Sequence, residues 1–553
     1  MVRTIRTCSL GLAGALILAA VPAEARVTTF VRSGASTFVA AQAAANAGDA
    51  RRAAMLYASL AAAEPGNRTI ANRALAQAIL AGDMPLALRL ARATPGADLA
   101  PDARLLLLAD DLRERRPPSA LAAGWPDELG FVTPFVRAWT LSERGKRRDA
   151  LAALDNVARD NLLAPLVPEH KALILLANWK AKEAQAFIPT ALGRAGGRGD
   201  RLRILFASGL LRAGSRDAAL ALLRGRDVTL AAAATQLSAQ RRPDFPAVTA
   251  AQGFGELLSG LAVLLNQSER SALPLSIVQV ARFSDPANEQ TAILLGLLLA
   301  GSDRSDDALA VLRRVPDSSP LASEARDAEI RTLLRAERRP EALARAQAFV
   351  AGARVTADDW SRLGDVFDAM ARHGEAADAF ANAARLTDAG GPGPERWSLY
   401  LLRGASLEQA GRWTEAEKSL EAAHALAPDN PVVLNYLGYA RLERGVRLDE
   451  AEALIAEASR RAPDDASITD SLGWAQFKRG KLPEAIATLQ RAAAADPGQA
   501  EIHEHLGDAL YTAGRLYEAR FAWSAALVTA EDDVRKRIEA KIAAGLTPTT
   551  AAP

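Results

Sequence analysis

Apolar residues in the last third of the chain recur in blocks of about 34 residues. Each block holds two stretches in which apolar side chains return every three or four positions, which is the spacing of one helix face. A glycine separates the two stretches, and a proline follows the second stretch in the first three blocks. Four such blocks lie between residues 397 and 533. They predict antiparallel helix pairs stacked into a solenoid.

Small and large residues have separate roles within a block. In the second block, Gly438 and Ala451 allow two helices to approach closely, and Leu437 and Ile455 fill the seam between them. Gly445 can adopt the left-handed conformation that ends a helix. Prolines stop the second helix, because the residue before a proline disfavours helical geometry. These prolines are Pro428, Pro463 and Pro497.

The residues and spacing described above resemble the tetratricopeptide repeat (TPR) family. The resemblance implies an all-α fold, a TPR-type α-solenoid in which antiparallel helix pairs form a right-handed superhelix. It also implies that the first helix of each repeat lines an inner groove, where a partner binds. Weaker versions of the pattern extend toward the N-terminus, and we count about twelve units along the chain.

The weaker units predict degenerate TPR-like repeats over residues 26–389, with a clear unit at 357–389. Trp360, Gly364 and Phe380 mark that clear unit. The segment 225–290 carries the weakest marks. The N-terminal part is therefore expected to continue the same solenoid with less regular packing.

The regular part is bounded by two predicted features. A Gly/Pro run at residues 390–396 predicts a bent loop before the four well-formed repeats at 397–533. An apolar stripe at helical spacing predicts a capping helix at 534–546, which would cover the open face of the last repeat. We expect residues 547–553 to be a disordered tail. The stripe consists of Val534, Ile538 and Ile542.

Residues 1–25 have the pattern of a Sec signal peptide: Arg3 and Arg6, an apolar run, and the cleavage site Ala23–Ala25. An uncleaved membrane anchor is the alternative, although the run is shorter than the roughly 20 residues that span a bilayer. Cys8 is the only cysteine and precedes the apolar run, so we expect neither a lipoprotein nor a disulfide. The sequence predicts a periplasmic protein.

Composition and charge narrow the function. Lys and Arg (67) nearly balance Asp and Glu (65), so the charge does not indicate nucleic acid as a partner. Of the five histidines, His503 and His505 are two positions apart on a helix and cannot share a metal ion. The chain past the leader has no nucleotide-binding, zinc-protease or serine-hydrolase motif. We therefore expect no cofactor, no metal and no catalysis.

The family resemblance carries groove positions onto the first helices of the regular repeats. Aromatic residues form only 5% of the chain, yet several fall at these positions. Aromatic side chains flanked by polar ones are common anchors for a bound peptide. The alternative is that they pack partly against the next repeat. The predicted partner-binding residues are Asn435, Tyr439, Asp470, Trp474, Phe477, Lys478, Glu504, Asp508 and Tyr511.

The leading hypothesis is a periplasmic scaffold or adaptor that binds a protein or peptide partner. The order 435–439, 470–474 and 504–508 resembles bacterial envelope TPR proteins, some of which deliver cell-wall hydrolases to processing proteases. One alternative is a scaffold of an exopolysaccharide secretion apparatus. Another is an enzyme acting on glycans or peptidoglycan, which would need a cleft with paired, perturbed carboxylates in segment 225–290.

Overall fold

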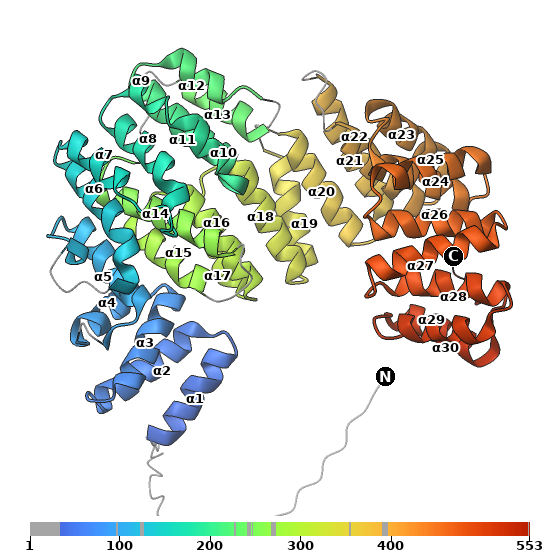
Figure 1. Cartoon of the computed structure of the whole chain (residues 1–553), viewed down its shortest axis with the longest axis horizontal. Helices are drawn as coiled ribbons and strands as arrows, with labels where there is room; N and C mark the ends of the chain where they lie inside the picture. The colour runs from blue at the N-terminus through green and yellow to red at the C-terminus, as the bar shows by residue number, and fades with distance from the viewer. Residues whose placement is uncertain are drawn as a thin grey trace, which may run out of the picture.

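A computed structural model describes residues 34–95, 98–121, 127–225, 228–239, 245, 247–266, 273–352, 355–389, 396–550 and 552. All regular secondary structure in these ranges is helical, and the helices follow one another in an open arch (Figure 1). The predicted leader and residues 390–395 of the predicted Gly/Pro loop lie outside the described residues. No helix of the described ranges combines the length and apolarity that a membrane span requires.

The helices alternate in direction along the chain. The first half contains α1 (Gly34–Asn46), α2 (Ala50–Ala63), α3 (Arg68–Ala81), α4 (Met84–Ala93), α5 (Pro101–Arg113), α6 (Thr133–Glu143), α7 (Arg147–Asp155), α8 (Val167–Ala177), α9 (Ala181–Ala184), α10 (Ile188–Gly193), α11 (Gly199–Arg212), α12 (Arg216–Leu222), α13 (Val228–Ala239), α14 (Ala250–Asn266), α15 (Leu273–Ser284), α16 (Glu289–Gly301) and α17 (Ser305–Leu312). Short 3-10 turns are η2 (Ser119–Leu121), η3 (Asp127–Val132), η4 (Ala164–Leu166) and η5 (Gly196–Arg198).

The second half contains α18 (Ala322–Arg335), α19 (Arg339–Val350), α20 (Ala357–Ala369), α21 (His373–Ala389), α22 (Arg396–Gln409), α23 (Trp413–Leu426), α24 (Pro431–Glu443), α25 (Leu448–Arg461), α26 (Ala466–Lys478), α27 (Leu482–Ala495), α28 (Ala500–Thr512), α29 (Leu516–Ala526) and α30 (Asp532–Ala544). Pairs α22/α23 to α28/α29 fall where the four regular repeats are predicted. Helix α30 falls at the predicted cap.

Each regular pair is closed by a glycine that faces a large side chain. A Cβ on Gly438 would lie 2.7 Å from Cγ1 of Ile455 and 2.9 Å from the backbone oxygen of Ala451. A Cβ on Gly507 would lie 2.3 Å from the Trp523 ring. Only glycine leaves room for helices this close, so the glycine period sets the spacing of the pairs.

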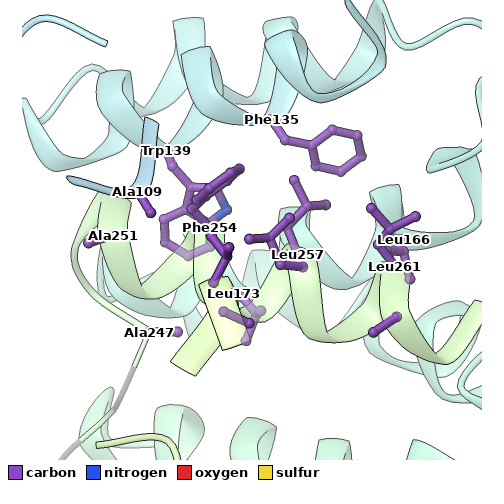
Figure 2. Close-up of a cluster of buried hydrophobic side chains, with 14 of the residues drawn as sticks. Ala109, Phe135, Trp139, Leu166, Leu173, Ala247, Ala251, Phe254, Leu257 and Leu261 are labelled. Carbon is purple, nitrogen blue, oxygen red and sulfur yellow. The ribbon is translucent and has the colours of Figure 1, made fainter. Parts of the chain in front are cut away.

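Helices α14 and α15 make the N-terminal part differ from a simple solenoid. They contact α3, α5 and α6 of much earlier units (Figure 1). Figure 2 shows Phe254 and Leu257 of α14 among side chains of α6 and α8, including Trp139. A Cβ on Gly253 would lie 2.1 Å from that tryptophan ring. The expected series of degenerate repeats therefore folds back and buries one helix pair inside its own curve.

Polar contacts fix this return of the chain. Gln279 Nε2 of α15 donates to the backbone oxygen of Leu80 at 3.2 Å, across 199 positions of sequence. Arg304 Nη1 donates to the same oxygen at 2.7 Å. In a solenoid each repeat contacts only its neighbours. These bonds close the N-terminal part into a ring, and its large apolar core extends from Ala54 to Ala308.

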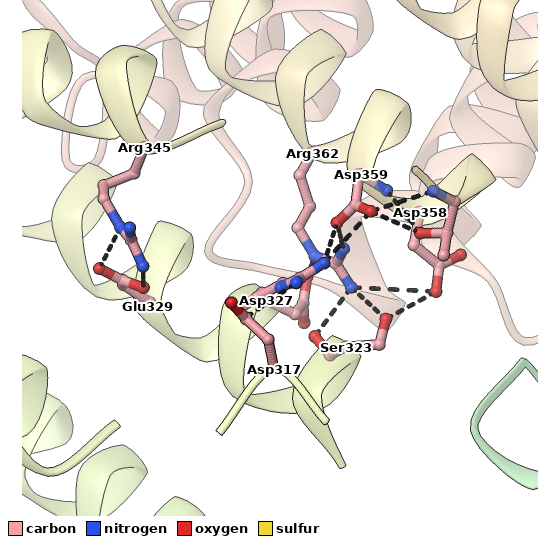
Figure 3. Close-up of polar contacts among 10 residues, drawn as sticks. Asp317, Ser323, Asp327, Glu329, Arg345, Asp358, Asp359 and Arg362 are labelled. Carbon is pink, nitrogen blue, oxygen red and sulfur yellow. Dashed lines mark hydrogen bonds and ion pairs between the residues drawn. The ribbon is translucent and has the colours of Figure 1, made fainter. Parts of the chain in front are cut away.

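A buried ionic cluster joins α18 to α20, at the start of the clear unit predicted at 357–389. Asp359 is fully buried and accepts from Arg362 Nη1 at 3.1 Å and from Arg326 Nη1 at 3.1 Å (Figure 3). Arg362 Nη2 also donates to the Ser323 backbone oxygen at 2.8 Å. The same carboxylate completes a capping box with Thr356 at the start of α20. One carboxylate thus starts a helix and binds two arginines.

Replacing Gly438 with alanine tests the glycine constraint. The new methyl group meets a backbone oxygen, which cannot rotate away, so Gly438→Ala should destabilise the repeat by about 1–3 kcal/mol. Urea denaturation measures the change. Gly374→Ala is the matched control, because no atom lies within 4 Å of a Cβ at that helical position. Equal stability of the two variants would contradict the assignment.

Candidate functional site

The concave side of the regular repeats contains a cavity of about 340 Å³ between α22, α24, α26 and the start of α28. Three predicted groove residues line it: Asn435, Tyr439 and Asp470. The other lining residues are Glu408, Gln409, Tyr436, Ala440, Glu443, Ser467, Ser471, Gln499 and Glu501. The first helices of successive repeats present these side chains to one space, as the sequence pattern predicts.

The cavity is acidic. Four of its lining residues carry carboxylates, and none of its lining residues is basic. The Tyr436 hydroxyl donates to Glu408 Oε2 at 3.2 Å. Burial is the main reason why the pKa values of Tyr436 and Tyr439 are raised, and the neighbouring carboxylates raise them further. Both phenols therefore stay protonated and can donate hydrogen bonds. The four carboxylates belong to Glu408, Glu443, Asp470 and Glu501.

Two buried acceptors of the cavity have no hydrogen-bond partner among the described residues. They are Asn435 Oδ1 and Asp470 Oδ1. A buried acceptor that lacks a donor costs about 1–3 kcal/mol. The cavity therefore favours a ligand that brings N–H or O–H donors.

Trp474 is predicted as an exposed anchor, but the structure buries it. Its ring is 1% exposed and stacks between His505, at 4.1 Å between ring centroids, and Phe477, at 4.8 Å. Its Nε1 donates to Glu443 Oε1 at 3.3 Å. Lys478 is exposed, and its Nζ lies 4.9 Å from the centre of the Trp474 ring. This tryptophan forms the floor beside the acidic cavity.

His505 is a residue that the sequence analysis did not place in the site. Its Nδ1 lies 2.9 Å from Asp470 Oδ2. Burial lowers the pKa of His505, but the charge and hydrogen bond of Asp470 outweigh this effect and raise it above the usual value. The pair ties α28 to α26. No local sequence pattern predicts that His505 stacks on Trp474 of the preceding repeat.

Glu504 and Asp508 are predicted to face the groove, and the structure corrects that assignment. Both are buried at 1% exposure or less. Lys541 Nζ of α30 lies 2.6 Å from Glu504 Oε1 and 2.8 Å from each oxygen of Asp508. Arg537 adds two bonds of 2.8 Å to Glu504. The capping helix takes the place of a next repeat, so it covers these carboxylates.

Tyr511 is half-buried at the same end of the groove. Its ring centroid lies 5.4 Å from that of Trp523, and its hydroxyl lies against the backbone of Gly545. Part of the tail that we expect to be disordered is placed here. Residue Ala552 is buried, and its N–H donates to Asp508 Oδ2 at 2.9 Å.

A second cavity of about 420 Å³ lies in the N-terminal part between α11, α13, α14 and α16. It contains the carboxylates of Glu256 and Asp285, in the segment where an enzyme would need them. Arg201 pairs with Glu256, and burial raises the pKa of Asp285 to about 6. No group of three His, Cys, Asp or Glu side chains in the described ranges could hold a metal ion.

Models of the tetratricopeptide repeat family match residues 361–431, 407–472 and 473–514. Over these residues, 361–514, the chain is a tetratricopeptide repeat protein. The predicted family and its all-α solenoid fold are thereby confirmed. The TPR repeats make the protein an interaction scaffold with protein partners. No curated protein matches the chain in sequence.

Solved structures resemble this TPR protein at low identity. The Cut9–Hcn1 hetero-tetramer of the APC/C matches with TM-score 0.37 and 16% identity, over 94% of this chain and 97% of the other. A tetratricopeptide repeat protein from Parabacteroides merdae matches with TM-score 0.37 and 15% identity, over 45% of this chain and 96% of the other. Yeast Tom70 matches with TM-score 0.34 and 12% identity, over 93% and 95%.

Removing the Lys541 charge should undock the capping helix. Lys541→Met leaves two buried carboxylates without their shared cation, which costs about 3–5 kcal/mol. Amide hydrogen exchange in α30 should accelerate by roughly a hundredfold or more. Lys481→Met is the control: its pair with Glu452 is exposed, and such pairs contribute about 0–1 kcal/mol. Unchanged exchange in Lys541→Met would contradict the role of this lysine.

The second cavity predicts a pH effect. Because folding raises the pKa of Asp285 to about 6, its contribution to stability is complete at acid pH and is lost as the pH rises through about 6. Asp285→Asn should therefore gain stability relative to wild type, by up to about 3 kcal/mol, between pH 4 and pH 8. Thermal unfolding at both pH values measures this. The exposed Asp160→Asn should show no such gain, and a flat Asp285→Asn difference would contradict the burial effect.

Proposed function

We propose that this TPR protein is a non-catalytic periplasmic adaptor that holds a segment of a partner protein in its concave groove. The observation that carries the proposal is the acidic cavity on α22, α24, α26 and α28. It lies where the first helices of consecutive repeats meet. The partner segment inserts a basic side chain, a lysine or an arginine, into this cavity.

Charge and hydrogen bonding support a basic side chain. Within the described ranges, no lysine or arginine forms an ion pair with Glu443 or Glu501. The buried acceptors Asn435 Oδ1 and Asp470 Oδ1 offer sites for the N–H donors of an ammonium or guanidinium group. Charge-assisted hydrogen bonds are roughly twice as strong as neutral ones. A cation therefore gains both charge pairing and hydrogen bonds here.

The signal pattern of residues 1–25 supports export to the periplasm. The envelope-type order of residues 435–439, 470–474 and 504–508 favours an adaptor for a protease or a cell-wall hydrolase. A scaffold of an exopolysaccharide secretion apparatus is the second candidate. Both roles use the same groove, and the identity of the captured partner separates them.

A capture experiment tests the groove assignment. The bait is the tagged protein, and its partners are recovered from periplasmic extract of the host. Tyr439→Ala combined with Glu443→Gln should lower the recovery of the main partner at least tenfold, since it removes an aromatic wall and a carboxylate charge that no lysine or arginine of the described residues neutralises. Recovery by the wild type should weaken as ionic strength rises.

The matched control replaces the same residue types on an exposed part of α29. Tyr517 is 76% exposed and Glu518 pairs with Arg515 at the surface, so Tyr517→Ala with Glu518→Gln should leave capture unchanged. Circular dichroism confirms that both double variants are folded. The proposal fails if the two variants recover the same partners in equal amounts.

A further inference from the structure

The C-terminal tail turns back onto the groove face of its own last repeats. Helix α30 ends at Ala544, and Gly545 has φ +86°, a conformation that side chains disfavour. A Cβ on Gly545 would lie 2.2 Å from the Tyr511 hydroxyl. The chain therefore reverses direction at Gly545, where its backbone packs directly against Tyr511, a predicted groove residue.

A short turn follows the reversal. The Thr550 hydroxyl accepts from Thr547 N–H at 2.9 Å, and Thr550 N–H donates to the Thr547 carbonyl at 3.0 Å. Leu546 packs against the apolar cluster of α28, α29 and α30. These contacts hold the start of the tail at the end of the groove.

Ala552 lies farther along the groove. It is 4% exposed and belongs to the buried cluster of Trp474 and Leu442, against which Tyr439 and Phe477 pack. Its N–H donates to Asp508 Oδ2 at 2.9 Å. The tail thus passes from Tyr511 on α28 to the aromatic floor formed by α24 and α26. The residues that the tail contacts come from three consecutive first helices, α24, α26 and α28.

We propose that the surface formed by Tyr511, Asp508 and Trp474 beneath the tail is a peptide site, and that tail residues 545–550 and 552 occupy it within the same molecule. The site takes a segment of small residues without charged side chains, which bends in the turn from Thr547 to Thr550. Small side chains fit because the backbone itself contacts Tyr511, and the carboxylate of Asp508 selects a backbone N–H. This proposal rests on the proposed function, since a partner in the groove competes with the tail.

The occupant is argued from three observations. The tail sequence contains only small or apolar residues and no charged side chain, which suits a surface whose nearest carboxylate is already neutralised by Lys541. The tail is joined directly to α30, beside the site, so its effective concentration at the site is in the millimolar range. Its described residues already make the contacts. The basic side chain of a partner belongs to the neighbouring acidic cavity instead.

Binding of a synthetic peptide tests the site. The probe is a fluorescein-labelled peptide of residues 545–553, and the acceptor is the protein truncated after Ala544. Fluorescence anisotropy should show saturable binding. Full-length protein should bind the probe at least tenfold more weakly, because the tethered tail competes. A probe with Ala552→Pro lacks the donated N–H and should lose about tenfold in affinity.

A second variant tests the site in the full-length protein. Gly545→Val places a branched side chain at φ +86° against Tyr511, so the tail should be expelled and probe affinity should rise to that of the truncated protein. Ala543→Val, at an exposed position of α30, is the control and should leave the affinity unchanged. Hydrogen exchange of the Ala552 amide in wild type should be slowed at least tenfold relative to Gly545→Val.

Two results would overturn the proposal. One is a folded truncated protein that does not bind the probe. The other is an Ala552 amide that exchanges equally fast in wild type and in Gly545→Val. This second result decides the question in the case that the truncated protein does not fold. Loss of partner capture by the Tyr439/Glu443 variant, without any binding of the probe, would leave the proposed function standing and remove only the tail site. If the protein binds the probe but captures no partner, the tail site stands and the proposed function is removed.

Discussion

The contact between a glycine of one helix and a large side chain of the next is the constraint on which the regular part depends. At Gly438 a backbone oxygen lies 2.9 Å from where a Cβ would be, so the two helix backbones lie almost in contact. Repetition of this close approach keeps the first helices of successive pairs side by side. The groove exists because α22, α24, α26 and α28 present their side chains to one concave face. The acidic cavity follows from the same spacing.

The C-terminal end of the solenoid and the inside of its N-terminal part are covered by different kinds of interaction. At the C-terminal end, Lys541 and Arg537 of α30 neutralise two carboxylates that a further repeat would otherwise cover. Inside the N-terminal part, an apolar pair, α14 and α15, returns into the curve and buries its surface against α3, α5 and α6. The first solution is ionic and local. The second is hydrophobic and spans some 200 positions of sequence.

The sequence alone predicts those features that repeat. Glycine, alanine and proline at fixed spacing indicate the helix pairs, and the groove positions of Asn435 and Tyr439 follow from their place on the first helix. Glu504 and Asp508 occupy equivalent positions, yet they are buried, because their environment depends on α30 rather than on another repeat. The return of α14 is also missed, since a single contact between distant helices leaves no period. The spacing of residues within a repeat predicts the packing within that repeat and against its neighbours. It does not predict which segment covers the end of the solenoid.

The carboxylates of the groove differ in what neutralises them. Toward the C-terminus, Asp508 and Glu504 are paired with Lys541 and Arg537. Asp470 shares one oxygen with His505, while its other oxygen has no partner within the described residues. Glu443 Oε1 accepts a hydrogen bond of 3.3 Å from Trp474 Nε1 and has no ion pair with a lysine or arginine of the described residues. Within the described residues, the carboxylates without a paired lysine or arginine therefore gather around the cavity, at Glu443, Asp470 and Glu501, whereas Glu504 and Asp508 are compensated. A cationic side chain gains most near α24 and α26, whereas the compensated end near α28 suits an uncharged segment.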